Sequence, residues 1–152
     1  MEDYSSACIA RYLDVDALIA SEPPRSTAAV HIGGIAVECQ IKAQILVYHR
    51  ISKWTQLGQR PKESYYGRPV DRPGHHLLSA VKVMGRVYER ARADPLFIKH
   101  LDRLMHPVGS RNADFIDLRY AGSDIAQNSL DDWRQSLKYV DGWLRKNEAL
   151  AK

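Results

Sequence analysis

The chain has 152 residues, of which 45% are hydrophobic and 26% charged, which is the composition of an ordinary globular protein with a buried core. Its formal net charge of +4 is mildly basic. That charge is compatible with anionic ligands but is too small to demand a nucleic acid as partner. The first residues, MEDYSSACIARYLD, are acidic and lack a long apolar stretch, so a signal peptide is not expected.

The first helix is expected to begin with Ser5 or Ser6 as its cap and to end at the sequence Ser21-Glu22-Pro23-Pro24. Its apolar face consists of Cys8, Tyr12, Val15 and Ile19. Neither Cys8 nor Cys39 has a CxxC partner, which predicts two free buried thiols in a reducing, cytoplasmic protein. No His, Cys or acidic residue stands at a recognisable zinc spacing, so neither a metal nor another cofactor is expected.

A central helix is predicted over 28–50, capped by Ser26 or Thr27 and apolar on two sides. One side comprises Ala28, Ile32, Ile35, Cys39, Ala43 and Leu46, and the other Val30, Val37, Ile41, Ile45 and Tyr48. A narrow polar row lies between them and consists of His31, Glu38, Lys42 and His49. The pair Gly33-Gly34 predicts that another helix or chain segment crosses closely at that point. We therefore expect a buried soluble helix and no membrane span.

The remaining chain begins with a long loop, 52–74. A third helix is then expected from near His75, with an apolar stripe of Leu77, Val81, Met84, Tyr88 and Ala91. Asp94-Pro95 opens a short helix that runs to about Met105, and 111–122 is interpreted as a turn or short helix. Ser129 and Asp132 form a capping-box-like start to the last helix, whose stripe is Leu130, Trp133, Leu137, Val140 and Leu144. Four main helices and a short one, without period-two alternation, predict one all-α bundle over 1–152 with its core at about 28–146.

Three stretches resemble the HEPN family (higher eukaryotes and prokaryotes nucleotide-binding domain). HIGGIAVECQIKAQIL is similar to the family's second helix, with Glu38, Lys42 and Ala43 as its Glu and Lys-Ala. GHHLLSAV is similar to the His-x-Leu motif that opens the third helix, and either His75 or His76 would be its His. DLRY resembles the Arg-Tyr dipeptide before the final helix.

The resemblance implies an antiparallel four-helix bundle with an additional short helix, commonly a homodimer, that binds nucleotides or RNA. Many members are paired with a small nucleotidyltransferase in a toxin–antitoxin-like system. One branch consists of metal-independent ribonucleases that use Arg-x4–6-His. Arg111-Asn112 look like the start of that motif, but Ile116, Asp117 and Leu118 stand where its His would fall. The bare spacing also occurs at Arg25…His31 and Arg68…His75, outside the region in which the family keeps the motif.

The function expected is therefore a dimeric nucleotide- or RNA-binding module that is not itself a nuclease. One alternative is a toxin-type ribonuclease with an unconventional pair such as Arg68 and His75, and another is a pure dimerisation or adaptor domain. The residues expected to bind the ligand are Lys42, His75, His76, Arg119 and Tyr120. Each of these residues also has a structural interpretation. Lys42 would form a helix-supporting pair with Glu38, and the two histidines would cap a helix or form a turn. Arg119 would form a salt bridge, and the ring of Tyr120 would be buried under the last helix.

The loop 52–74 has the composition of a single-stranded nucleic-acid site, with basic and aromatic residues interleaved. The residues concerned are Lys53, Trp54, Arg60, Lys62, Tyr65, Tyr66, Arg68 and Arg72. The same composition would suit a solvated loop folded over one end of the bundle.

Overall fold

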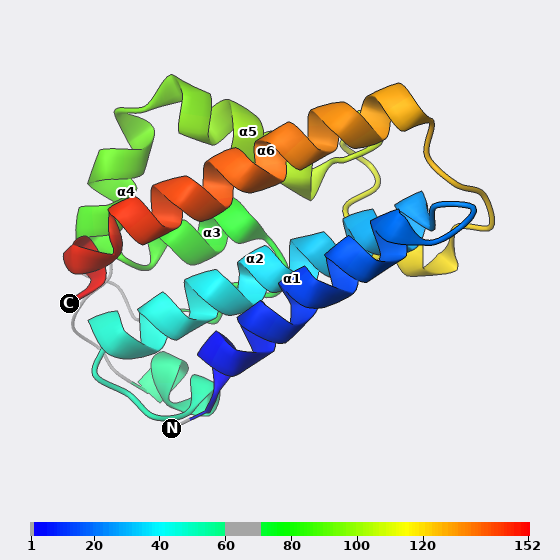
Figure 1. Cartoon of the computed structure of the whole chain (residues 1–152). Coiled ribbons are helices and arrows are strands. Elements are labelled where there is room, and N and C mark those ends of the chain that lie inside the picture. Colours follow the sequence, from blue (N-terminus) through cyan, green and yellow to red (C-terminus); the bar gives the residue numbers. More distant parts are fainter. Residues whose placement is uncertain (1, 60–70) are drawn as a thin grey trace.

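The structure is a computed structural model that describes residues 2–59 and 71–152, and within those ranges it contains helices and no strand (Figure 1). Its α-helices are α1 (Tyr4–Ala20), α2 (Ser26–Tyr48), α3 (Leu77–Lys82), α4 (Gly85–Arg92), α5 (Pro95–Met105) and α6 (Gln127–Lys146). Three 3-10 helices accompany them: η1 (Trp54–Gln59), η2 (Asp117–Tyr120) and η3 (Glu148–Ala151). The predicted all-α class is confirmed.

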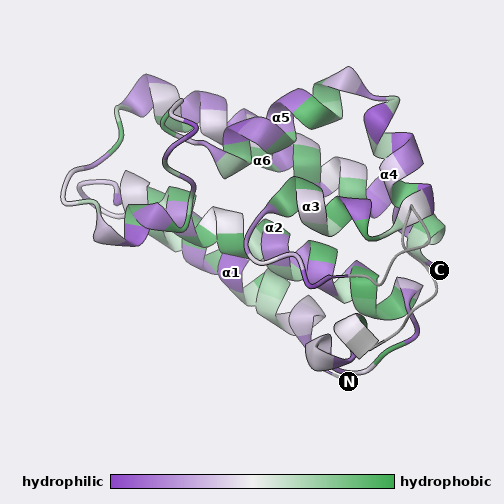
Figure 2. Ribbon diagram, turned by 180° about the vertical axis from the view of Figure 1, so that it is seen from behind, coloured by the Kyte–Doolittle hydropathy of each residue, from purple (hydrophilic) through white to green (hydrophobic). Residues whose placement is uncertain are grey.

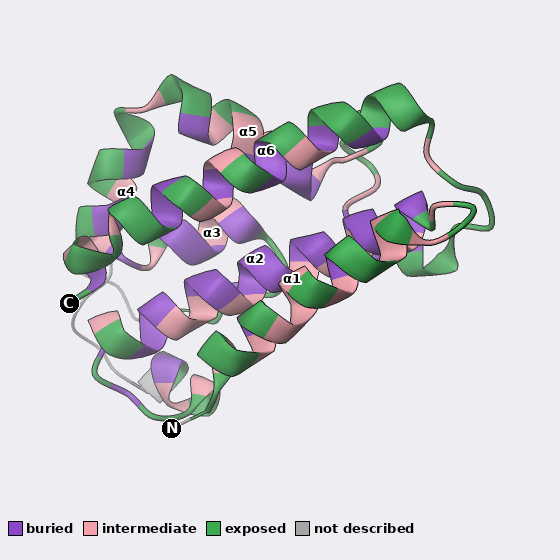
Figure 3. Ribbon diagram, viewed as in Figure 1, coloured by how far each residue is buried: buried purple, intermediate pink, exposed green. Residues whose placement is uncertain are grey.

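Helix α2 is the central element, and α1, α3, α5 and α6 all contact it. α1 and α2 lie side by side and run in opposite directions, whereas α6 runs in the same direction as α2 (Figure 1). One predicted side of α2, from Val30 to Ile45, is fully buried, while most of the other side is half-buried beneath its neighbours (Figure 3). α2 is long and apolar enough to cross a membrane by length and composition, and 61% of its apolar 18-residue window is buried by the rest of the chain.

The glycine pair of α2 is where two other segments approach it most closely. A Cβ on Gly33 would collide with the ring of Trp133 from α6, and one on Gly34 would collide with the ring of Phe115. Both rings are buried. The prediction of a close crossing is confirmed, because only glycine leaves room for two aromatic rings against the helix backbone.

The helix caps differ from those predicted for α1, α2 and α6. The cap of α1 is Asp3, whose carboxylate accepts the Ser6 N–H at 2.9 Å, so the serines lie inside the helix. α6 begins at Gln127 after Ala126, two residues before the Ser129 that was expected to cap it. These predictions were wrong because several neighbouring polar residues offered similar caps, and the path of the incoming chain selects among them.

The start of α2 is held by a distant segment in place of a local cap. The Ser26 and Thr27 hydroxyls donate to the carbonyls of Ile125 and Ser123, at 3.0 and 2.7 Å. The Asp124 carboxylate accepts the Thr27 N–H at 3.3 Å. The prediction that Ser26 or Thr27 caps the helix was therefore wrong, since both hydroxyls bind the chain that leads into α6.

The predicted third helix is in fact two helices, α3 and α4, separated at Val83-Met84. His49 Nε2 hydrogen-bonds the Val83 carbonyl at 2.8 Å and so satisfies a backbone group that the break releases. The predicted apolar stripe continues across the break, since Leu77, Val81, Met84 and Ala91 are all buried. Periodicity alone did not reveal the break because a bend of this kind keeps the same residues facing the core.

The last helices match the prediction more closely. Asp94 caps α5 by accepting the Phe97 N–H at 3.2 Å, and α5 ends at Met105 as expected. The α6 stripe is buried throughout, and hydrophobic and hydrophilic residues alternate along α5 and α6 (Figure 2). Segment 111–122 contains a short helix, η2, as predicted.

In the predicted loop 52–74, residues 54–59 form η1, and the part from 60 to 70 lies outside the described residues. Both cysteines are free thiols, as predicted, but only Cys8 is buried and Cys39 is half-buried.

Candidate functional site

Three residues of the polar row of α2, His31, Glu38 and His49, contact segments that follow α2 in the chain. His31 Nδ1 lies 2.8 Å from the Phe115 carbonyl, and His49 bonds the Val83 carbonyl across the break between α3 and α4. The buried Glu38 carboxylate places one oxygen 2.6 Å from Lys42 Nζ and the other 2.8 Å from His75 Nδ1. The row therefore forms contacts that fasten α2 to its neighbours, and it includes the Glu38–Lys42 pair of the structural interpretation.

Lys42 is enclosed by other side chains. Besides its ion pair with Glu38, its ammonium lies 4.8 Å from the centre of the Trp54 ring and 5.6 Å from that of Tyr4. Only 17% of its side chain is exposed. Burial raises the pKa of Tyr4 to about 12, so its hydroxyl stays neutral at physiological pH. Because the Lys42 ammonium already contacts a carboxylate and two aromatic rings, it is poorly placed to bind an incoming phosphate.

His75 is more accessible, with 56% of its side chain exposed. Because a carboxylate accepts hydrogen bonds, Nδ1 carries the proton in this pair, and Nε2 is the nitrogen left for solvent. His76 has a local role: its Nδ1 accepts the Ser79 N–H at 3.1 Å and caps α3. The capping role that was one interpretation of the two histidines therefore belongs to His76, whereas His75 binds the Glu38 carboxylate.

The basic loop is described only in part. Lys53 and Arg72 are exposed, and Trp54 is half-buried beneath Lys42. The predicted loop residues outside the described ranges are Arg60, Lys62, Tyr65, Tyr66 and Arg68. The suggested Arg68–His75 pair lies partly outside these ranges as well.

Arg119 and Tyr120 lie near the opposite end of α2 from Lys42. Both belong to η2, and Arg119 lines a pocket of about 370 Å³ together with Ala28, whereas Tyr120 is not among the residues that line it. Ala28 and Lys42 are fourteen residues apart, which is about 21 Å along a helix. The five residues predicted to bind one ligand are thus divided between two places.

The pocket beside η2 has a cationic lining, and we call it the Arg25–Arg119 pocket. Arg25, His31 and Arg119 line it together with Thr27 and the 121–124 turn. The Arg119 guanidinium lies 4.7 Å from the centre of the Tyr120 ring, and Tyr120 is 78% exposed. The buried-ring interpretation of Tyr120 is therefore wrong. The one acidic lining residue, Asp124, is engaged with the start of α2.

A second cavity, of about 680 Å³, adjoins this pocket. The two share Thr27, Leu118, Ala121, Ser123 and Asp124. Lys99 and Arg103 add positive charges to the second cavity, Asp102 and Asp132 add negative ones, and Arg103 lies 3.8 Å from Asp132. Together the two cavities form a polar hollow from α5 to the start of α2.

Sequence reasoning did not assign Arg25 and His31 to the ligand site. Arg25 was noted only for the Arg-x5-His spacing, which lies outside the family's usual region for that motif, and His31 for that spacing and for its place in the polar row of α2. The structure brings both residues to one pocket with Arg119, because η2 packs against the first turns of α2. Among the described residues no group of three or more His, Cys, Asp or Glu side chains is arranged to hold a metal ion.

No protein-family model matches this chain, and no curated protein and no solved structure matches it either.

Proposed function

We propose that this protein is a HEPN-like four-helix module that binds a nucleotide or a short single-stranded RNA in the Arg25–Arg119 pocket. The observation that carries the proposal is the convergence of Arg25, His31 and Arg119 on one cavity, with the exposed ring of Tyr120 next to the Arg119 guanidinium. The order of the HIGGIAVECQIKAQIL, GHHLLSAV and DLRY motifs supports the family resemblance.

The chemistry of the pocket suits a phosphate attached to a planar base. Guanidinium groups donate two parallel hydrogen bonds to phosphate oxygens and remain charged at all physiological pH values. An exposed tyrosine offers a ring face for an unpaired base, and the adjacent Arg119 favours a stacked ligand. The adjoining cavity would accommodate a second nucleotide along the strand.

Lys42, His75 and His76 have no direct part in this proposal. Lys42 and His75 share the Glu38 carboxylate, and His76 caps α3. None of the three lines the pocket, and Lys42 is eleven residues, about 16 Å along the helix, from His31, the pocket residue nearest to it on α2.

The test is fluorescence anisotropy with a labelled oligouridylate of about six nucleotides at near-physiological salt. The wild-type protein is expected to bind, Arg119→Gln to bind at least tenfold more weakly, and Tyr120→Ala to lose about five- to 100-fold, as when one base–aromatic stack is removed.

The matched control is Arg111→Gln, which removes an exposed arginine before η2 that does not line the pocket. It is expected to bind as the wild type does. No binding by the wild-type protein, or an equal loss in the Arg111 and Arg119 variants, would refute the proposal.

A second candidate function, metal-independent RNA cleavage in the same pocket, is favoured by the position of His31. The Phe115 carbonyl accepts the Nδ1–H at 2.8 Å, which leaves the Nε2 lone pair as the basic site. In this reaction Nε2 takes the proton of a ribose 2′-hydroxyl and O2′ bonds to phosphorus. The 5′ oxygen then leaves with a proton from water, and Arg25 and Arg119 offset the charge on the phosphorus oxygens.

Incubation with RNA in EDTA distinguishes the two functions. Cleavage would leave 2′,3′-cyclic phosphate ends, and it should disappear in His31→Gln while binding persists. His76→Asn is the control, because asparagine also caps helices and His76 lies outside the pocket. An intact RNA after prolonged incubation would exclude the nuclease function and leave the binding function standing.

A further inference from the structure

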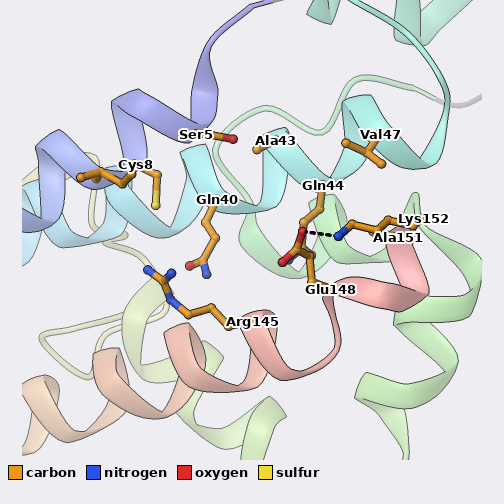
Figure 4. Close-up of a pocket in the computed structure, with 11 residues that line it drawn as sticks. Ser5, Cys8, Gln40, Ala43, Gln44, Val47, Arg145, Glu148, Ala151 and Lys152 are labelled. Atoms are coloured by element: carbon orange, nitrogen blue, oxygen red, sulfur yellow. Dashed lines mark ion pairs between the residues drawn. The ribbon is translucent and has the colours of Figure 1, made fainter.

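A groove with a mainly apolar lining lies between α1, α2 and the C-terminal end of the chain (Figure 4). Its apolar residues are Cys8, Ile9, Ala43, Val47 and Ala151. Burial raises the pKa of Cys8 to about 11, so the thiol stays protonated and neutral at physiological pH. The volume of the groove is about 210 Å³, smaller than the sites of about 300–1,000 Å³ that hold drug-sized ligands. It therefore suits a short apolar chain.

Gln44 brings to this groove a polar atom that the protein itself does not use. The residue is only 7% exposed, and its Nε2 donates to the Leu144 carbonyl at 3.1 Å. Because a carbonyl can only accept, this contact fixes which end of the side-chain amide is the NH2 group. No described residue donates a hydrogen bond to the other end, Oε1. A ligand that supplies a donor there satisfies a largely buried acceptor.

Gln40, one helical turn earlier on α2, shows what a fully used amide looks like in the same groove. Its Oε1 accepts the Tyr12 hydroxyl at 3.1 Å, and its Nε2 donates to an Asp141 carboxylate oxygen at 3.0 Å. Both glutamine side chains extend from α2 toward α6 and the C-terminal turn (Figure 4). The comparison identifies Gln44, and not Gln40, as the group left to recognise a ligand.

The charges at the edge of the groove are paired within the chain. Arg145 Nε lies 2.8 Å from an Asp141 oxygen, and Lys152 Nζ lies 3.0 Å from a Glu148 oxygen. An ionic ligand would have to compete with these pairs, whereas a neutral one would not. The electrostatics of the lining therefore favour a neutral ligand.

We propose that this groove binds a small neutral molecule with a short alkyl chain and a carboxamide head. The head donates an N–H to Gln44 Oε1, and its carbonyl accepts the second N–H of Gln44 Nε2. A carboxamide has its donor and its acceptor on two atoms, as Gln44 does, whereas a hydroxyl has both on one atom. The chain lies against Ile9, Ala43 and Val47. This site does not depend on the proposed nucleotide function, because it shares no lining residue with the Arg25–Arg119 pocket.

Three probes of nearly the same shape test the head group. Hexanamide is expected to bind with a Kd of about 1 mM, a value typical of a ligand of this size. 2-Heptanone keeps the chain and the carbonyl but has no N–H, and hexanoate is charged and also lacks a donor. Both are expected to bind about tenfold more weakly. 2-Heptanone is the more apolar probe, so apolar burial alone would give the opposite order.

The titrations are followed by the backbone and side-chain amide resonances of 15N-labelled protein. The shifts produced by hexanamide should centre on the side-chain NH2 of Gln44 and on the backbone of its neighbours in the groove. Gln44→Met keeps an unbranched side chain of similar length but removes the amide. This variant should bind hexanamide no more tightly than 2-heptanone. Circular dichroism melting checks that it is folded.

A second variant tests the place of binding without a change at Gln44. Ala43→Leu fills part of the groove from a half-buried position of its lining, and it should weaken hexanamide binding at least about tenfold. Ala17→Leu is the matched control, because Ala17 is exposed on α1 and does not line the groove. It should bind as the wild type does.

Four results would overturn the proposal. The first is the absence of localised shifts at about 20 mM hexanamide, well above the expected Kd. The second is binding of 2-heptanone or hexanoate as tight as that of hexanamide. The third is a preference for the amide that persists in Gln44→Met, and the fourth is unchanged hexanamide binding in Ala43→Leu.

Discussion

Gly34 has no side chain, and the ring of Phe115 occupies the space that one would fill. Gly33 stands in the same relation to Trp133. Each glycine costs helix stability of about 1 kcal/mol relative to alanine, yet the pair lies in the middle of the most buried helix. The cost is offset because the glycines let two large aromatic rings pack directly on the backbone.

Gly34→Ala is therefore expected to destabilise the protein by about 1–3 kcal/mol, in spite of alanine's better helix propensity, because the Phe115 ring must move. Gly142→Ala is the control, since nothing lies within 4 Å of a Cβ at that exposed position of α6. It should stabilise by about 0.5–1 kcal/mol. Urea unfolding measures both, and a neutral or stabilising Gly34→Ala would contradict this packing.

The polar residues of α2 contact several different segments of the chain. Glu38, which pattern analysis paired only with Lys42, also holds His75 from a segment 37 residues away. His31 and His49 bind backbone carbonyls that belong to other elements. The residue spacing identified the polar row within the apolar helix, but only the fold could show which groups its side chains contact.

Among the helices, α5 and α6 are joined through one carboxylate. Asp94 caps α5 by accepting the Phe97 N–H, and its second oxygen accepts the Trp143 indole N–H at 3.0 Å. The Trp143 ring also stacks on Phe97, with centroids 3.9 Å apart. One residue thus fixes both the start of α5 and its position against α6.

Asp94→Ala should cost about 2–4 kcal/mol of unfolding free energy, because it removes a cap and leaves a largely buried indole N–H without its acceptor. The comparison is Asp3→Ala, which removes only the exposed cap of α1 and should cost about 1 kcal/mol. Thermal unfolding by circular dichroism tests both. Equal losses in the two variants would show that the Trp143 contact contributes little.

The whole molecule buries several groups that ionise at alkaline pH. Burial raises the pKa of Cys8 to about 11 and that of Tyr4 to about 12, and it also raises the pKa of Tyr12. In the unfolded chain these groups ionise near their ordinary values, about 8.5 for a thiol and about 10 for tyrosine. Above those values the unfolded state loses protons that the folded state keeps.

The stability contributed by these neutral groups is therefore complete below about pH 8.5 and falls as the pH rises through 9 to 11. Urea unfolding at pH 8, 9.5 and 10.5 should show a progressive decrease in the free energy of unfolding. Cys8→Ala should make the decrease shallower over that range. A free energy that stays constant or increases with pH would contradict the burial of these groups.

The sequence by itself determined the all-α class, the close crossing at Gly33-Gly34, the Asp94 cap and the apolar stripe of α6. These features depend on local spacing and on residue size, both of which can be read along the chain. The tertiary structure alone decided which polar residues form the start of α2, where the third helix breaks, and which side chains share a pocket. Arg25, His31 and Arg119 converge because η2 packs on the first turns of α2, whereas Lys42 stays about 16 Å from His31 along the same helix. Contacts between residues about 90 positions apart depend on how helices pack, and that packing is set by the whole core rather than by any local pattern.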